Sequence, residues 1–388
     1  MRGSNEWIDA RPWSGTCFRA RERQQGATVN YWEYIRVEEL LRLQGGIDGD
    51  ESKRSNDEVL FIVVHQVYEL WFKLVLRELQ SARDLFQQNP VPDMALAGAT
   101  RSLKRVTTIF QQAVHHFQVM ETLTTRDYLD FRDTLIGASG FQSAQMREIE
   151  ILLGLDEEKR LPLGVESSYK EALKSMDGSS SPALDRVEKR LHGGQSLKSV
   201  VYAWLARTPV SEVGPEKYLA DVLTSHKAEM ERRLAIVEER MKLPESEMLL
   251  WRKRYDEELK AAERFLLCEG EGADVAHRRK VRAALVFLES YRELPRLAWP
   301  REAIDALLEM EQAMIIWRQR HARMVERIIG RRTGTGGSAG VDYLDQTALR
   351  YRVFDEVWAV RTLLLREGAV PPIGNADDFR FRVEDRLT

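Results

Sequence analysis

Cysteine is scarce in this chain of 388 residues. Its two cysteines, Cys17 and Cys268, lie far apart in the sequence, so they provide neither a disulfide framework nor the spacing of a zinc ribbon. The first residues lack the apolar run of a signal peptide, and no stretch approaches the length needed to span a bilayer. These absences favour a reducing compartment, and we expect a soluble, cytoplasmic protein without a membrane partner.

Neither sign of charge is in large excess. Lysine and arginine number 58 against 61 aspartates and glutamates, which gives a formal net charge of −3. Without a global basic field, duplex nucleic acid is a poor partner, and we expect no nucleic-acid binding. Alternation of apolar and polar residues with period two is rare, and so are segments rich in β-branched residues. The sequence therefore gives little support for a fold based on a sheet.

Long amphipathic runs are what the sequence does contain. Apolar residues make up 43% of the chain and charged residues 31%, which is typical of a globular protein with a large core. Apolar side chains recur every three or four positions, which is the spacing of a helix with one buried face. We predict an all-α fold, with the clearest helices at 56–88, 143–153, 216–241, 249–268 and 301–330. Further helices are predicted at 31–41, 94–123 and 343–365.

Composition also divides the chain. The region from 155 to 250 is charged and contains a low-complexity linker at 177–182. A long charged helix begins near 216 and is expected to lie in solvent or to pair antiparallel with 246–268. We expect a polar N-terminal arm (1–27), the first part of a helical core (28–154) and an inserted, mostly helical charged region (155–300). The second part of the core (301–365) and a loose tail (366–388) follow.

The stretch from Trp317 to Gly340 carries a histidine on an amphipathic helix that ends in a glycine-rich loop. His321 shares one helical face with Trp317 and Met324, so it is either a core histidine or a metal ligand. The loop matches the dinucleotide-binding fingerprint only formally, because it follows a helix and not a strand. Its glycines allow a close backbone approach to a ligand, and Thr335 offers a hydroxyl. An ordinary flexible connection explains the same composition.

A second histidine lies on the predicted helix that begins near Asn56, whose side chain we expect to cap the first turn. Phe61, His65 and Phe72 belong to one aromatic face of that helix. A histidine beside aromatic rings suits a hydrogen bond to a flat heteroaromatic ligand. The alternative is a buried histidine bonded to a carbonyl group.

Tyr128 and Arg132 lie four residues apart, so on a helix their tips reach the same point. A guanidinium group binds a carboxylate through two hydrogen bonds, and a phenol can add a third. The pair would therefore suit an amino acid or another carboxylic acid. The alternative is a surface ion pair of Arg132 with Asp127 or Asp133.

Together these segments resemble the tryptophan 2,3-dioxygenase family, and the resemblance extends from about residue 28 to 365. The motifs that carry it occur in the family's order. They are Tyr31-x-x-Tyr34-Ile, the helix from Asn56 through His65 to Lys73, Phe131-Arg-Asp133, Ser139-Gly-Phe-Gln-Ser143, the island around Trp204, Trp317-Arg-x-Arg-His321 and Gly334-Thr-Gly-Gly-Ser-Ala-Gly340.

The resemblance implies a helical-bundle haem dioxygenase fold with an inserted helical subdomain. It also implies an enzyme that opens the indole ring of L-tryptophan with O₂ to give N-formylkynurenine. His321 matches the proximal ligand of haem b, which is active in the ferrous form, and the absence of a Cys-x-x-Cys-His motif agrees with noncovalent haem. His65 matches the distal histidine that meets the indole N–H, and Phe61 matches the aromatic wall beside the indole.

The family pattern also assigns the remaining site residues. Arg132, helped by Tyr128, matches the carboxylate clamp, and Thr335 matches the residue that meets the substrate ammonium group. Ser139 belongs to the distal pocket, where it and Gly140 are expected beside the haem. Tyr31 and Tyr34 match residues that reach a neighbouring protomer, which implies a homotetramer built as a dimer of dimers.

Several positions depart from the family pattern. Ile136, Gly137 and Ala339 replace residues that the family usually has there, so the breadth of substrates stays open. Trp204 and Arg207 resemble part of a second, noncatalytic tryptophan site. Two other functions remain alternatives: a haem monooxygenase that inserts one oxygen atom, and a nonenzymatic helical protein that binds a carboxylate ligand.

Overall fold

The computed structural model describes residues 30–135, 140–162, 168–175, 177–269, 272, 274–332 and 340–380. No strand occurs among these residues, which confirms the all-α prediction. The chain forms two compact units, Met1–Arg54 and Ser55–Thr388, and each is described by itself.

The first unit contains two short helices, α1 (Tyr31–Tyr34) and α2 (Val37–Leu40). The prediction of one continuous helix at 31–41 is therefore wrong. Arg36, between the two helices, has a φ of 56°, and a residue in this left-handed region cannot continue a right-handed helix.

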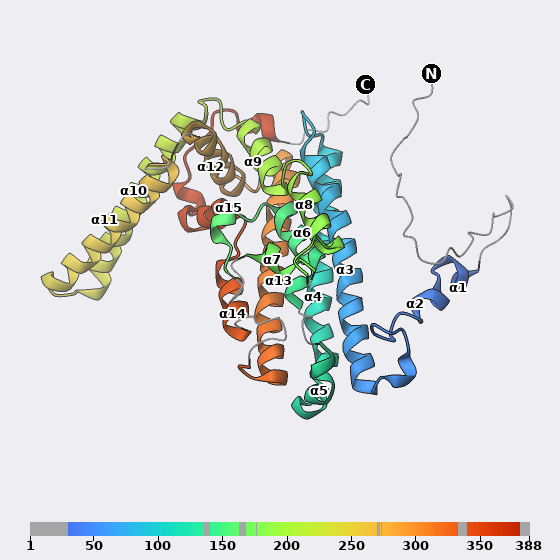
Figure 1. The fold of residues 1–388 in the computed structure, drawn as a ribbon. Coiled ribbons are helices and arrows are strands. Elements are labelled where there is room, and N and C mark those ends of the chain that lie inside the picture. The colour runs from blue at the N-terminus through green and yellow to red at the C-terminus, as the bar shows by residue number, and fades with distance from the viewer. Residues whose placement is uncertain are drawn as a thin grey trace, which may run out of the picture. The chain divides into compact units, whose positions relative to one another are not determined.

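The second unit consists of helices joined by short connections (Figure 1). Its α-helices are α3 (Asn56–Phe86), α4 (Asp93–Met120), α5 (Thr125–Arg132), α6 (Ala144–Leu153), α7 (Tyr169–Ala172), α8 (Pro182–Leu191), α9 (Leu197–Arg207), α10 (Pro215–Met241), α11 (Glu245–Leu266), α12 (Val275–Ser290), α13 (Ala298–Ile329), α14 (Val341–Arg350) and α15 (Asp355–Val360). Two short 3₁₀ helices that flank the site are η2 (Asp133–Leu135) and η3 (Gly140–Gln142).

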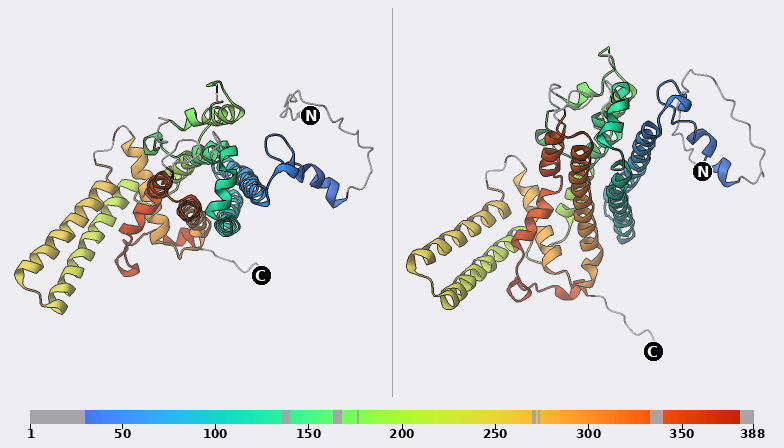
Figure 2. Two further views of the ribbon diagram at one scale, coloured as in Figure 1. Left: turned by 60° about the horizontal axis from the view of Figure 1, so that its bottom comes forward. Right: turned by 90° about the horizontal axis from the view of Figure 1, so that it is seen from below.

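Three long helices, α3, α4 and α13, form the centre of this unit and lie side by side (Figure 2). α4 packs against both of the others, while α6 and α9 cover α3, and α14 covers α13. Large side chains from α3 and α4 are fully enclosed, among them Phe86, Phe110 and Phe117. This arrangement holds the two histidine-bearing helices, α3 and α13, in one rigid bundle.

Helix α3 begins one residue earlier than its sequence signal suggested. The side chain of Ser55, and not that of Asn56, accepts the hydrogen bond from the backbone N–H of Glu58, at 3.1 Å. Asn56 is the first helical residue, so the predicted cap is wrong. Both residue types cap helices well, and sequence alone does not choose between neighbours.

Helix α3 is also long and apolar enough to cross a membrane by length and composition alone, with a mean hydropathy of 1.7 in its most apolar window. The expectation that no stretch reaches this length is therefore wrong for α3. One such helix is weak evidence for a membrane protein, because core helices of soluble proteins pass the same test.

The predicted closing helix at 343–365 is interrupted between α14 and α15. Glu311, buried on α13, accepts hydrogen bonds from the backbone N–H groups of Val353 (2.5 Å) and Phe354 (3.2 Å). Because these N–H groups bond to a side chain, they do not continue the ladder of α14.

The residues after Glu367 are not loose where the structure describes them. The hydroxyl of Tyr291 donates a hydrogen bond to the carbonyl of Pro371 at 2.5 Å, and the ring of Phe379 lies 5.4 Å from that of Phe287. The expectation of a loose tail is therefore wrong up to residue 380.

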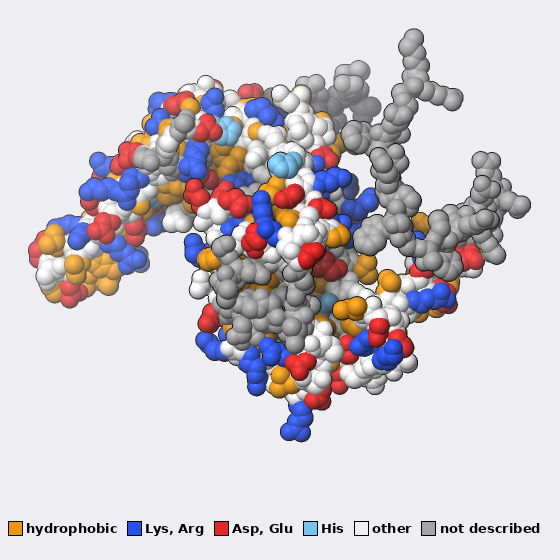
Figure 3. Space-filling model, viewed as in Figure 1, with side chains coloured by type: hydrophobic (Ala, Val, Ile, Leu, Met, Phe, Trp, Pro, Cys, Tyr) orange, Lys and Arg blue, Asp and Glu red, His pale blue; other side chains and the backbone are white. Residues whose placement is uncertain are grey.

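Helices α10 and α11 form an antiparallel hairpin that extends from the rest of the second unit, as predicted (Figure 2). Charged side chains of both signs cover its surface (Figure 3). The division of the chain at residues 155 and 300 stays a prediction.

Candidate functional site

A cavity of about 590 Å³ lies among α3, α4, α5, α6, α13 and α14. His65 from α3 and His321 from α13 both line it. Most of its wall is apolar, and its apolar lining residues include Phe72, Phe117, Met120, Met324, Ile328 and Leu344. The two histidines singled out in the sequence thus line one cavity, although 256 positions separate them in the chain.

The ring of His65 is held by its own helix. Its Nδ1 lies 2.7 Å from the carbonyl oxygen of Phe61, one turn earlier, and the ring centroids of these residues are 4.1 Å apart. A carbonyl oxygen can only accept, so Nδ1 carries the proton. Burial lowers the pKa of His65, partly offset by the Phe61 hydrogen bond and the charge of Glu69. The neutral ring therefore keeps an acceptor at Nε2, and the exposed surface of this side chain faces the cavity that it lines.

The ring of His321 packs against two aromatic rings that also contact each other. It is parallel to Phe117, with an interplanar angle of 2° and 5.5 Å between centroids, and it stacks on Trp317 at 5.4 Å. Burial lowers the pKa of His321 to about 4, and the charges of His65 and Arg318 act in the same direction. At neutral pH this imidazole is unprotonated and can offer a lone pair to a metal.

Helix α5 brings Tyr128, one residue of the predicted carboxylate clamp, to the cavity wall. Tyr128 lines the cavity 6.2 Å from the ring of Phe61. Burial raises the pKa of Tyr128, and the charge and hydrogen bond of Arg132 partly oppose this. Asp127, one of the two alternative partners for Arg132, forms a capping box with Thr124. Arg132 does not itself line the cavity, but its side chain is hydrogen-bonded to Tyr128, which does.

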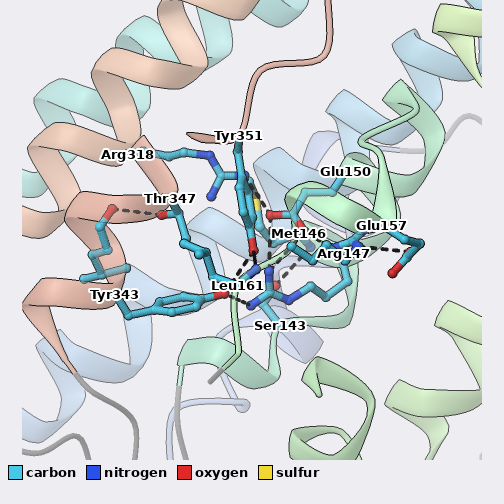
Figure 4. A network of polar contacts seen from close by, with 12 residues as sticks. Ser143, Met146, Arg147, Glu150, Glu157, Leu161, Arg318, Tyr343, Thr347 and Tyr351 are labelled. Atoms are coloured by element: carbon cyan, nitrogen blue, oxygen red, sulfur yellow. Dashed lines mark hydrogen bonds and ion pairs between the residues drawn. The ribbon is translucent and has the colours of Figure 1, made fainter. Parts of the chain in front are cut away.

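A buried ionic network forms another part of the cavity wall (Figure 4). Its centre is Glu150 on α6, which binds the guanidinium groups of Arg147 at 3.0 Å, Arg160 at 2.8 Å and Arg318 at 2.7 Å. Burial alone would raise the pKa of Glu150, but the charges of the three arginines outweigh it and lower this pKa to about 2. Three cations around one carboxylate leave an excess of positive charge beside the cavity.

Comparison with known proteins identifies the family. A model of the tryptophan 2,3-dioxygenase family matches residues 16–364. The chain belongs to the tryptophan 2,3-dioxygenase family. It is 65% identical over 366 residues to tryptophan 2,3-dioxygenase of Sorangium cellulosum, covering 92% of this chain and 88% of that one. It is 56% identical over 364 residues to tryptophan 2,3-dioxygenase 2 of Ralstonia nicotianae, covering 92% and 98%. A tryptophan 2,3-dioxygenase-like protein of Xanthomonas campestris is 51% identical over 270 residues, covering 68% of this chain and 99% of that one.

For this member of the tryptophan 2,3-dioxygenase family, several predicted site residues can be placed. His65, Phe61, Tyr128 and His321 line the cavity, and so does Gly140, the first residue of η3. Tyr31 and Tyr34 belong to the other unit, where 74% and 76% of their surfaces are exposed. Ser139, Thr335, Ile136, Gly137 and Ala339 lie outside the described residues, so their roles stay predictions.

The second tryptophan site suggested by the family resemblance also stays a prediction. Trp204 is buried against Phe86, with 5.2 Å between ring centroids. Arg207 donates a hydrogen bond of 3.4 Å to the carbonyl of Gln88. The end of α9 that carries Trp204 and Arg207 thus packs on the C-terminal end of α3.

Sequence reasoning missed the network around Glu150. A local signal was present, because Arg147 and Glu150 are charged residues three apart on one helix, a spacing that allows an ion pair. Arg318 is a further charged residue, next to Trp317 in the predicted helix that carries His321. What the sequence does not show is that both segments and Arg160 meet at one carboxylate.

We predict that Glu150→Gln lowers the free energy of unfolding by about 3 kcal/mol, because it leaves buried guanidinium groups without their counter-charge. The contribution of the wild-type carboxylate is complete above its ordinary pKa of 4.5 and is lost as the pH falls toward 2. Urea denaturation of both proteins between pH 7 and pH 3 measures this difference. Glu157→Gln is the matched control, because Glu157 is exposed and its one ion-pair partner among the described residues is Arg160. Equal stability of the Glu150→Gln and Glu157→Gln proteins at pH 7 would contradict the prediction.

Proposed function

We propose that this protein is a haem b enzyme that opens the indole ring of L-tryptophan with O₂. Both oxygen atoms enter the product, N-formylkynurenine, in the first step of the kynurenine pathway of tryptophan catabolism. Membership of the tryptophan 2,3-dioxygenase family supports the reaction. The single observation that carries the proposal is that two neutral histidines from α3 and α13 border one largely apolar cavity, together with the aromatic rings of Phe61 and Tyr128.

The cavity fits a haem in three respects. Its volume of about 590 Å³ lies within the usual range for cofactor pockets, and its walls are largely apolar. An imidazole with a depressed pKa is available as an axial ligand. Arg147 and Arg318 supply positive charge for the two propionate groups, and the buried Nε of Arg147 has no hydrogen-bond partner among the described residues.

We assign the iron to His321. The imidazole is neutral, and its packing against the rings of Phe117 and Trp317 limits its rotation. Its neighbour Arg318 is anchored to Glu150, so the ligand and the basic part of the cavity wall lie on the same rigid turn of α13. Activation of O₂ is the chemistry that the haem supplies when it is bound.

The other residues then position the substrate. Arg132 and Tyr128 bind the carboxylate of tryptophan, Thr335 meets its ammonium group, and the indole ring lies against Phe61. His65 accepts the indole N–H at Nε2, since Nδ1 is already committed to the carbonyl of Phe61. The lowered pKa of His65 makes it a poor base, so we assign it an orienting role. Apolar walls keep water from the reacting atoms.

A homotetramer, built as a dimer of dimers, completes the proposal. In the first unit, a short segment exposes several large apolar side chains, which is unusual for a free surface. They are Tyr31, Trp32, Tyr34, Ile35, Leu41 and Leu43. We propose that Tyr31 and Tyr34 cover the pocket of a neighbouring protomer, and that the enzyme is cytoplasmic, with neither a nucleic acid nor a membrane as partner.

Product analysis tests the reaction. We expect the haem-loaded protein, reduced anaerobically and then given L-tryptophan and ¹⁸O₂, to yield N-formylkynurenine that carries two labelled atoms. Mass spectrometry of the product measures this. One labelled atom without ring opening would indicate a monooxygenase. A protein that takes up no haem and leaves tryptophan unchanged would be a nonenzymatic binding protein.

A further inference from the structure

A second hollow, of about 470 Å³, lies outside the cavity among α3, α6 and α8. We call it the outer groove. It is lined by Glu69, Lys73, Gln142, Ser143, Gln145 and Arg186, together with three small apolar residues. Glu69, Gln142 and Ser143 also line the main cavity, so the two hollows adjoin at these three polar residues.

Charges of both signs border the outer groove. Glu69 is fixed by Gln145, whose side-chain amide donates to the main-chain carbonyl of Glu69 at 2.7 Å and to its carboxylate at 2.8 Å. Arg186, on α8, is bound to Glu148 at 2.8 Å. Lys73 is exposed and has no ion-pair partner among the residues that the structure describes. The junction with the cavity is thus acidic, and the groove beyond it carries a cation that is still available.

The spacing of these charges suits an α-amino acid. Glu69 and Lys73 are four residues apart on α3, so their Cβ atoms are separated by about 5–6 Å on one face of the helix. The ammonium and carboxylate groups of an α-amino acid are attached to one carbon atom, so both can be met by an acidic and a basic side chain on neighbouring turns of one helix face. The main cavity, in contrast, is walled mostly by apolar groups, and apart from Glu69 the charged groups in its lining, Arg147, Glu150 and Arg318, are bound to one another.

We propose that the outer groove is a docking site for the ammonium and carboxylate groups of L-tryptophan. The carboxylate of tryptophan binds Lys73 and its ammonium group binds Glu69 before the indole ring enters the cavity. This inference rests on the proposed function, because it takes tryptophan as the substrate. Its effect is kinetic, since a charge at the mouth of a pocket raises the rate of association with an oppositely charged group.

Association rates test the docking site without turnover. The haem-loaded protein is mixed anaerobically with L-tryptophan at low ionic strength, and binding is followed by the absorption of the haem. We expect Lys73→Met to slow association about three- to tenfold and to weaken its dependence on salt. Lys73→Arg should restore the rate. Arg77→Met is the matched control, because Arg77 is exposed one turn further along α3 and does not line the groove.

Ligand analogues identify the charge that is recognised. Tryptamine lacks the carboxylate, so its association should be the same in the wild type and in Lys73→Met. Equal rates for L-tryptophan in Lys73→Met, Arg77→Met and the wild type would overturn the docking site. Unchanged association with slower turnover at saturating tryptophan would assign the groove to product release and overturn the loading role. A wild-type protein that binds tryptophan anaerobically but forms no N-formylkynurenine would instead contradict the proposed function.

Discussion

Replacing His321 by alanine is expected to abolish axial ligation of the haem and to lower turnover by about a thousandfold or more. Mutation of a residue that only orients a metal ligand typically lowers activity or metal affinity by about ten- to a hundredfold. Removal of the ligand itself should lower them further. The side chain packs against Phe117 and Trp317, so alanine leaves a space beside these rings and removes the nitrogen that we assign to the iron. Absorption and electron paramagnetic resonance spectra of the haem-loaded variant measure the loss of ligation.

His65→Ala is the matched control for this experiment, because His65 is the other histidine that lines the cavity. It should keep the ligand signature of the wild type. Added imidazole should restore ligation to His321→Ala by occupying the vacated space. The reverse pattern, in which His65→Ala loses the signature and His321→Ala keeps it, would assign the iron to His65 and contradict our assignment.

Arg132→Leu should lower kcat/KM for L-tryptophan by about a thousandfold. Truncating one partner of a hydrogen-bonded charge pair typically costs about 2–5 kcal/mol, which is about thirtyfold to several thousandfold at 25 °C. The upper part of this range applies if the carboxylate is held at the edge of a largely apolar cavity, where water replaces the guanidinium poorly. Steady-state kinetics with the haem-loaded enzyme measure the change.

Two controls separate this role from a general loss of structure. Arg126→Leu alters an exposed arginine on the same helix and should leave kcat/KM unchanged. Binding of tryptamine, which has no carboxylate, should be equally strong in Arg132→Leu and in the wild type. A loss of affinity for L-tryptophan and tryptamine by the same factor would mean that Arg132 supports α5 and does not bind the carboxylate.

The sequence predicted the parts of the fold that depend on local periodicity. The helices that carry His65 and His321 were placed to within a few residues, because each has a regular apolar face. The charge of the long helix near 216 also led us to expect that it lies in solvent or pairs with 246–268, and the structure shows α10 paired with α11.

The parts that sequence did not predict depend on distant contacts. The break before α15 comes from Glu311, which binds N–H groups more than forty positions away in the chain. Glu150 likewise meets Arg318 only because α6 and α13 converge on the cavity. The wrong choice of Asn56 over Ser55 as the N-cap of α3 has a local cause. Two residues that cap helices well are adjacent, and the backbone conformation decides between them.

The surplus of guanidinium groups around Glu150 also bears on how the enzyme matures. Like charges held together out of water repel one another, and this repulsion falls when a dicarboxylate molecule settles beside them. Folding and prosthetic-group uptake are therefore thermodynamically linked in this chain, so the loaded form should resist heat and proteolysis better than the empty one. A cell short of iron porphyrin would then hold less of this polypeptide, even at an unchanged rate of synthesis.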